Sequence, residues 1–283
     1  LPHIPPKIWQ ISILPNTSSS DNVFQPPAYV AKWLPLHPSY AYIILDTAGA
    51  FAAIARLKHT ISRQYLDAIY ARTGADIIQA DLARCAILAL EGSVYSDSDT
   101  SPLHPLPHWA PVELRNRTRL IVGIEADAQP PIPGTTYPVQ LSQWTFAGAK
   151  GYPVLWRMIR RVISEMRRQI EEAEGIEGEQ EGPKVVFSND DVLRVSSPAG
   201  WTEEIYEYLS EVTATEFTWK NLTGLENPTL FGDVLVLPVN GLATGVGHSG
   251  SSVSNVDGTM VKHFFLRILA CCMSTGHRRR KTA

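Results

Sequence analysis

Cysteine and long apolar runs are both scarce in this chain. Three cysteines occur among 283 residues, so a disulfide framework is excluded. Cys85 falls within an expected helix and is predicted to be a small core residue, whereas a bond between the adjacent Cys271 and Cys272 would be strained. No apolar run reaches the ~18 residues that a membrane span needs, and no signal peptide is visible. We therefore expect a cytosolic protein or the soluble part of a longer one.

An excess of charge of one sign is also lacking. The formal net charge is -3 and charged residues make up 19% of the chain, so composition gives no case for a nucleic-acid partner. The one basic cluster, Arg278 to Lys281, is expected to be an exposed end. Asn16, Asn116 and Asn221 each begin an Asn-X-Ser/Thr sequon, which favours the second possibility, the soluble part of a longer protein.

The chain is rich in apolar segments that alternate between strand-like and helix-like patterns. Apolar residues make up 44% of the chain, which suffices for a sizeable core. Short apolar runs predict strands, and helical periodicity predicts helices. The expected strands are 7–13, 40–45, 94–96, 120–124 and 234–237, and the expected helices are 54–70, 76–90, 153–173 and 201–209. This alternation predicts an α/β fold with a mixed sheet flanked by helices, in a single domain over 1–283.

Two segments are expected to lack regular structure. Residues 101–111 contain four prolines, which remove backbone donors. The acidic stretch at about 171–183 is predicted to be a mobile loop.

The run from Asp81 to Thr100 is the part of the sequence that most clearly points to chemistry. An amphipathic helix ends at Gly92, a short apolar step follows, and then come Asp97 and Asp99. If this segment is extended, the two carboxylates point the same way, because side chains alternate with period two. Mg²⁺ and Mn²⁺ accept carboxylate oxygens, and such an ion can neutralise a leaving diphosphate. A polar turn has the same composition and is the alternative interpretation.

The helix before this acidic loop carries one acid and one base. Asp81 and Arg84 are three residues apart and hence neighbours on one helix face. A surface ion pair is the simple interpretation. In the functional interpretation Asp81 accepts hydrogen bonds from sugar hydroxyls, and Arg84 binds phosphate or sugar oxygens in a forked geometry. Tyr95 either packs on the donor or fills the core.

Taken together, these residues resemble the signature of a known enzyme family. The pattern Asp81-x-x-Arg84-x-x-Ile87-Leu88-x-x-x-Gly92-x-x-Tyr95-x-Asp97-x-Asp99 is similar to that of the DXD-containing sugar transferases of glycosyltransferase family thirty-two. Within that family it resembles the fungal Golgi α-1,6-mannosyltransferases that initiate outer chains on N-glycans. Further similar segments lie at 6–11, 123–127, 143–145, 151–153, 232–238 and 261–263. The similarity spans roughly 4–266.

The resemblance implies a fold, a reaction and a location. The fold would be of GT-A type, with a Rossmann-like mixed sheet. The activity would be metal-dependent transfer of mannose from GDP-mannose to a mannose-containing N-glycan or glycoprotein, with retention of the anomeric configuration. The metal would be Mn²⁺ or Mg²⁺. The chain would be the luminal part of a Golgi type II membrane protein, whose membrane segment is absent from this sequence.

Residue roles follow from the same resemblance. Asp97 and Asp99 would hold the metal, with Asp99 as the direct ligand and His263 as a further metal or diphosphate contact. Donor contacts would come from Gln10, Ser12, Asp81, Arg84 and Tyr95, with Gln10 near the nucleotide. Glu125 and Asp127, together with Asp81 and Arg84, would lie at the reacting centre or the acceptor.

The sequence also departs from the family pattern. Cys85 stands for a tyrosine, Gly92-Ser93 for Gly-Gly, Ser12 for a tryptophan and Thr47 for a second acid. The closing Gly-Ser-Trp is missing after His263, and 267–283 is an atypical tail. These departures favour a second hypothesis, a non-catalytic descendant that binds a nucleotide-sugar or a glycan. A third hypothesis keeps the enzyme and changes the acceptor to inositol-phosphoceramide.

Overall fold

A computed structural model describes residues 1–12, 32–57, 76–174, 195–246, 249–252 and 256–264. Within these residues the main sheet has eight strands in the order β2-β1-β3-β7-β5-β9-β8, with β6 paired to β5. The strands are β1 Lys7–Ile11, β2 Ala41–Leu45, β3 Ser93–Ser96, β5 Leu120–Asp127, β6 Val139–Leu141, β7 Thr145–Gly148, β8 Thr229–Phe231 and β9 Val234–Leu237. β1 is parallel to β2 and β3, and β5 to β9, whereas β7 is antiparallel to β3 and β5.

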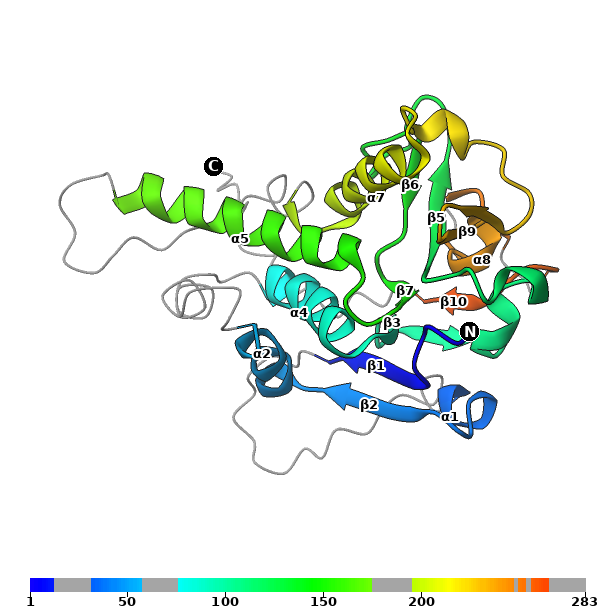
Figure 1. Cartoon of the computed structure of the whole chain (residues 1–283), viewed down its shortest axis with the longest axis horizontal. Helices are drawn as coiled ribbons and strands as arrows, with labels where there is room; N and C mark the ends of the chain where they lie inside the picture. Colours follow the sequence, from blue (N-terminus) through cyan, green and yellow to red (C-terminus); the bar gives the residue numbers. More distant parts are fainter. Residues whose placement is uncertain (13–31, 58–75, 175–194, 247–248, 253–255, 265–283) are drawn as a thin grey trace, which may run out of the picture.

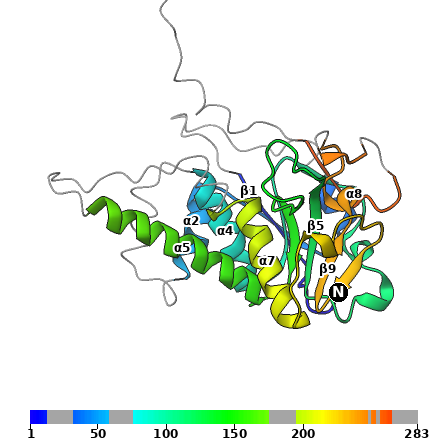
Figure 2. The same cartoon turned by 90° about the horizontal axis from the view of Figure 1, so that it is seen from above.

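Helices cover both faces of this sheet. They are α1 Trp33–Leu36, α2 Thr47–Ala55, α4 Asp76–Glu91, α5 Pro153–Glu174, α7 Pro198–Thr213 and α8 Val239–Leu242. α4 lies between α2 and α5 (Figure 1). Figures 1 and 2 both show β5 and β9 between α7 and α8. The structure thus confirms the predicted α/β fold with a mixed sheet flanked by helices.

Successive side chains of a strand point to opposite faces of the sheet, which explains why a core lies on each face. Val234 and Val236 of β9 pack into the core shared with α4, α5 and α7, whereas Leu235 and Leu237 pack into a second core with Leu242 of α8. Such strands are buried on both faces, which explains why they read as continuous apolar runs. Cys85 is 1% exposed within the first core, as expected, and burial raises the pKa of its thiol to about 12.

Two expectations of irregular structure were partly wrong. In the proline-rich segment, β4 Thr100–Pro102 pairs antiparallel with β10 Val261–His263, and Leu106–Trp109 forms a 3₁₀ helix. A proline is tolerated in β4 because a two-stranded ribbon consists of edge strands. Residues 171–174 belong to α5, and 175–183 lie outside the described residues, as does the tail 267–283.

Within the described part of the chain, no helix combines the length and the apolarity needed to cross a membrane.

The departure at Gly92-Ser93 has a local explanation. Both residues have positive φ, +71° for Gly92 and +98° for Ser93, and that region costs a non-glycine residue of order 1–3 kcal/mol. The Ser93 hydroxyl accepts a hydrogen bond from the backbone N–H of Lys7 at 2.9 Å and donates one to the Pro5 carbonyl at 2.6 Å. These bonds fasten the start of β3 to the start of β1, so a serine can replace the second glycine.

Candidate active site

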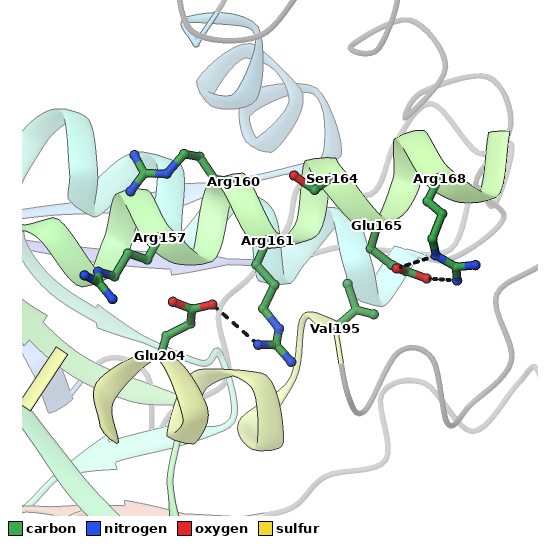
Figure 3. Close-up of a pocket in the computed structure, with 8 residues that line it drawn as sticks. All are labelled: Arg157, Arg160, Arg161, Ser164, Glu165, Arg168, Val195 and Glu204. Carbon is green, nitrogen blue, oxygen red and sulfur yellow. Dashed lines mark hydrogen bonds and ion pairs between the residues drawn. The ribbon is translucent and has the colours of Figure 1, made fainter. Parts of the chain in front are cut away.

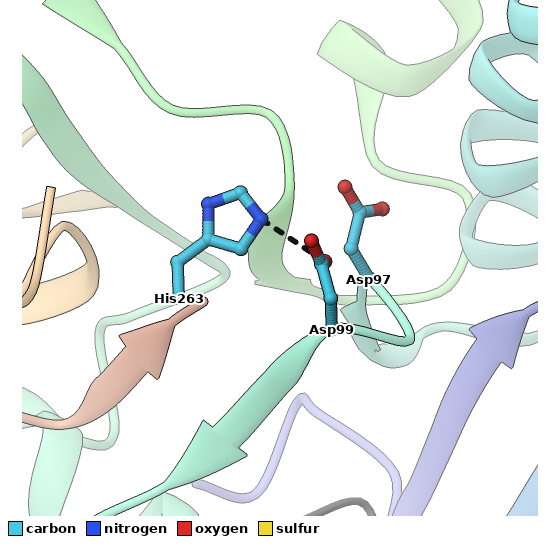
Figure 4. A group of neighbouring side chains, drawn as sticks. All are labelled: Asp97, Asp99 and His263. Carbon is cyan, nitrogen blue, oxygen red and sulfur yellow. Dashed lines mark hydrogen bonds and ion pairs between the residues drawn. The ribbon is translucent and has the colours of Figure 1, made fainter. Parts of the chain in front are cut away.

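Three side chains that bind metals in other proteins meet at one edge of the sheet. Ligand atoms of Asp97, Asp99 and His263 all lie within 4.8 Å of one another. Figure 4 shows the imidazole of His263 directed at the Asp99 carboxylate, with the Asp97 carboxylate beside it. Nε2 of His263 is 3.0 Å from Oδ1 of Asp99, and its ring stacks on Trp144 with centroids 4.8 Å apart. The structure therefore brings the three predicted metal-binding residues together.

Long-range strand pairing places His263 in this group. In the β4–β10 ladder His263 pairs with Thr100, one residue after Asp99. The backbone N–H of Phe264 donates to the Asp99 carbonyl at 3.0 Å, and that of His263 to the Thr244 carbonyl at 3.2 Å. The position of His263 relative to the acidic loop is thus set by backbone hydrogen bonds.

The acidic loop is a turn, not the extended segment that would make the two carboxylates parallel. The Asp97 carbonyl accepts the Thr100 N–H at 3.2 Å and the Thr100 hydroxyl at 2.6 Å. The backbone N–H of Asp97 donates to the Trp144 carbonyl at 2.7 Å. The turn interpretation and the metal interpretation are therefore compatible, since this turn directs both carboxylates to one place.

The donor set and its surroundings fit a divalent cation. Carboxylates suit Mg²⁺ and Mn²⁺, whereas imidazole suits transition metals, so the set as a whole fits Mn²⁺ better. The Tyr95 hydroxyl donates to Oδ1 of Asp97 at 2.6 Å. Nε2 of Gln10 donates to the Asp97 carbonyl at 3.0 Å. Contacts of this kind orient metal-binding side chains.

Asp81 and Arg84 form a buried pair beside this group, so the surface ion-pair interpretation is wrong. They are 4% and 9% exposed. Nη2 of Arg84 is 3.0 Å from Oδ1 of Asp81 and 3.4 Å from Oδ1 of Asp97. The guanidinium also lies over the Tyr95 ring, 4.9 Å from its centroid. Arg84 therefore links helix α4 to the acidic turn.

Burial and charge oppose each other in this pair. Burial raises the pKa of Asp81 above its ordinary value, although Arg84 and two serine hydroxyls favour the carboxylate. Burial alone would lower the pKa of Arg84, but the negative charge of Asp97 and other neighbours more than offsets it, so that pKa is raised. Arg84 thus remains a cation, which suits it to bind an anionic diphosphate, while two acidic side chains contact it.

The remaining predicted donor contacts lie at the same edge of the sheet. Tyr95 is 1% exposed and packs against Phe146, so it fills the core while its hydroxyl reaches Asp97. Gln10 is on β1 and accepts a hydrogen bond from the Tyr42 hydroxyl. Ser12 follows β1, and its N–H donates to the Leu45 carbonyl at 2.8 Å. Gln10 and Ser12 thus lie at the carboxyl end of β1, and ligands of open α/β sheets bind outside the carboxyl ends of the strands. Contact of these residues with the donor stays a prediction.

The two acids of β5 have different surroundings. Glu125 is 6% exposed, and its carboxylate accepts a hydrogen bond from Nε2 of Gln140 at 2.9 Å. Burial raises the pKa of Glu125 to about 7, against the smaller effects of Gln140 and the nearby His263. Asp127 is half-buried and accepts hydrogen bonds from the Thr223 hydroxyl at 2.8 Å and the Gly224 N–H at 2.6 Å. Glu125 is therefore a buried acid bonded to Gln140 and influenced by the charge of His263, whereas Asp127 holds the loop at Thr223.

Glu125 should make stability depend on pH. Its pKa is raised from 4.5 to about 7 on folding, so its contribution is fully present below pH 4.5 and is lost as pH rises through about 7. The loss corresponds to about 3 kcal/mol. Urea unfolding with a chelator present should show that Glu125→Gln removes a decline of this size between pH 4.5 and 8. Parallel pH profiles for the parent and the variant would contradict the assignment.

Several residues of the site were missed in the sequence. The hydroxyls of Ser196 and Ser197 donate to Oδ2 of Asp81 at 2.7 and 3.0 Å. They lie 115 and 116 residues away along the chain, and only the Ser-Pro step that begins α7 marks them locally. The Gln143 carbonyl accepts a hydrogen bond from Nη1 of Arg84 at 3.0 Å. Gln143 lies in the 143–145 segment that resembles the family, and the resemblance assigns it no role.

A cavity of about 650 Å³ lies elsewhere, between α5 and α7. Its lining includes Arg157, Arg161, Arg168 and Glu204 (Figure 3). Each of these arginines is already paired with glutamates: Arg161 with Glu203 and Glu204, Arg157 with Glu207 and Glu211, and Arg168 with Glu165 and Glu172. The cavity contains none of the metal-binding residues, and the ion pairs of Arg157 and Arg161 join the two helices.

Comparison with known proteins finds similarity to glycosyltransferases. Residues 27–116 match a family model described as the glycosyltransferase sugar-binding region containing the DXD motif. The chain is 35% identical over 265 residues to the initiation-specific alpha-1,6-mannosyltransferase of Schizosaccharomyces pombe. The aligned part covers 93% of this chain and 63% of that protein. The chain is 28% identical over 258 residues to the protein of the same name from Candida albicans, covering 84% and 65%. The chain thus spans about 63–65% of the length of these relatives.

Among solved structures, the PaToxG glycosyltransferase has 15% sequence identity and a TM-score of 0.44, covering 75% of this chain and 72% of that one.

Proposed function

We propose that this chain is a metal-dependent mannosyltransferase. It is similar to fungal α-1,6-mannosyltransferases and matches the model of a DXD sugar-binding region. In this proposal the fold is of GT-A type, the donor is GDP-mannose and the acceptor is a mannose-containing N-glycan, joined through an α-1,6 linkage. The observation that carries it is the meeting of Asp97, Asp99 and His263 beside the buried Asp81–Arg84 pair. A polar turn on the surface would not gather a histidine, three acids and an arginine around one point.

Asp97, Asp99 and His263 would hold Mn²⁺. The ion, when bound, supplies positive charge to the diphosphate of the donor. Arg84 adds a second, permanent positive charge, and Tyr95 and Asp81 hold its guanidinium in place. Charges that are already oriented before the reaction stabilise a leaving group without reorganisation.

Glu125 is suited to the acceptor side of the reaction. With a pKa of about 7 it populates both protonation states near neutral pH, as general acid–base groups do. It would accept the proton of the acceptor hydroxyl. Retention would then follow from attack on the same face from which the diphosphate departs, and this route requires no protein nucleophile.

A second candidate rests on the altered end of the family pattern. Where the resembled family closes with Gly-Ser-Trp after its histidine motif, this chain reads Phe265-Leu266-Arg267-Ile268-Leu269. A homologue that binds GDP-mannose or a glycan without turnover would tolerate this change.

Location and partners follow from the same proposal. A Golgi luminal enzyme on glycoprotein acceptors would itself pass through the glycosylation machinery. The sequon residues Asn116 and Asn221 are exposed, which is compatible with that route, whereas Asn16 lies outside the described residues.

One assay separates the two candidates. Release of GDP from GDP-mannose is measured with Mn²⁺, with a chelator, and with or without a mannose oligosaccharide. The enzyme is expected to release GDP only with the metal, and faster with the oligosaccharide. Binding of GDP-mannose by intact protein without any release would instead establish the non-catalytic homologue.

A further inference from the structure

Gln143 has a buried side-chain amide that makes no hydrogen bond. The residue is 1% exposed, and both its Oε1 and its Nε2 are buried without a partner. Two other buried glutamines in the described residues differ. Gln10 bonds Asp97 and Tyr42, and Gln140 bonds Glu125 and the backbone of Thr136. Buried polar groups are nearly always paired, because an unpaired one retains its full desolvation cost. The exception at Gln143 therefore requires an explanation.

The position of Gln143 provides one. Its carbonyl accepts a hydrogen bond from Arg84 at 3.0 Å, and the next carbonyl, that of Trp144, accepts the Asp97 N–H at 2.7 Å. Gln143 thus lies between the buried Asp81–Arg84 pair and the metal-binding turn. Nε of Arg84 is also buried without a partner. Two residues that share a backbone hydrogen bond, Arg84 and Gln143, therefore each contain buried side-chain atoms without a partner.

We infer that the amide of Gln143 binds hydroxyl groups of the donor sugar and contributes to the choice of hexose. This inference rests on the proposed function. A carboxamide both donates and accepts hydrogen bonds, so it matches a sugar hydroxyl, which also does both. A site built to bond a hydroxyl rejects donors in which that hydroxyl is missing or misplaced, since its buried polar groups then remain unpaired. Because solvent does not reach the amide in this structure, donor binding must be accompanied by a local opening around Gln143.

The test uses Gln143→Met, which keeps the length of the side chain and removes the amide. If the amide is reserved for a ligand, the variant should melt at the same temperature as the parent or higher, because an unpaired buried amide is lost. Affinity for GDP with Mn²⁺, measured by calorimetry, should stay within about twofold. Affinity for GDP-mannose should fall by about tenfold or more, as expected for the loss of one or two hydrogen bonds.

Gln140→Met is the matched control, since both amide atoms of Gln140 are bonded. It should lower the melting temperature. A similar decrease in Gln143→Met would show that the amide has a structural partner and would overturn the inference. Equal losses for GDP and GDP-mannose, or no loss for either, would do the same. If the parent binds neither nucleotide with Mn²⁺, the proposed function itself fails and the inference falls with it.

Discussion

Asp99→Asn is expected to reduce metal-dependent GDP release by about 10³-fold, the equivalent of the several kcal/mol that a bound cation gives to a charged transition state. The substitution preserves the size of the side chain and removes its negative charge. Asp99 is 8% exposed and shares the metal-binding group with Asp97 and His263. A neutral amide in its place weakens Mn²⁺ binding, so the affinity for Mn²⁺ should fall together with the rate.

Asp257→Asn provides the control. Asp257 lies in an exposed turn outside the site, and its substitution changes the net charge by the same amount. GDP release should remain at the parental level, and the melting temperatures of both variants should show intact folds. If a folded Asp99→Asn protein retains near-parental release that still requires Mn²⁺, the metal has been assigned to the wrong residues.

The acidic turn and helix α4 were predictable because their signals are local. Apolar periodicity marks the helix, Gly92 ends it, and Asp97 and Asp99 follow at once. His263 and Asp99 are 164 residues apart along the chain, and the β4–β10 ladder brings them together. One of its strands contains Pro102, which in the sequence indicates irregular structure. From the sequence His263 was placed only by resemblance.

Burial was the property that the sequence described least well. Asp81 and Arg84 read as a surface pair because α4 has an apolar face, yet α2 and α5 enclose that helix on both sides. The serines that bond Asp81 lie 115 and 116 residues away along the chain, and no local pattern connects them to it. Gln143 lies in a short polar segment between β6 and β7, two strands that the sequence analysis did not predict. Pairwise hydrogen bonds over long sequence separations decide these roles, and periodicity carries no information about them.

Arg84→Met is expected to destabilise the protein by about 3–5 kcal/mol, as for a buried ion pair that loses one partner. The Asp81 carboxylate, at 4% exposure, would keep its two serine hydroxyls and lose its cation. GDP release should also become undetectable, because the permanent positive charge beside Asp97 is removed. Chemical unfolding and the GDP assay measure the two effects separately.

Neutralising Asp81 should recover the stability without the activity. In Arg84→Met/Asp81→Asn the amide oxygen still accepts from Ser196 or Ser197, and no charge is left buried, so at least half of the lost stability should return. The pKa of Asp81 is already raised by burial, and loss of Arg84 raises it further. The single variant should therefore lose more stability than the double variant as pH rises above the ordinary value of 3.8, since the decline due to Glu125 is common to both.

Arg168→Met is the control for the substitution itself, since Arg168 pairs with Glu165 and Glu172 on the surface of α5 with 53% of its side chain exposed. Exposed pairs contribute little, so stability and GDP release should both stay near the parental values. If the double variant were no more stable than Arg84→Met, the instability would come from lost packing over Tyr95, and the charge balance between Arg84 and Asp81 would not be its cause.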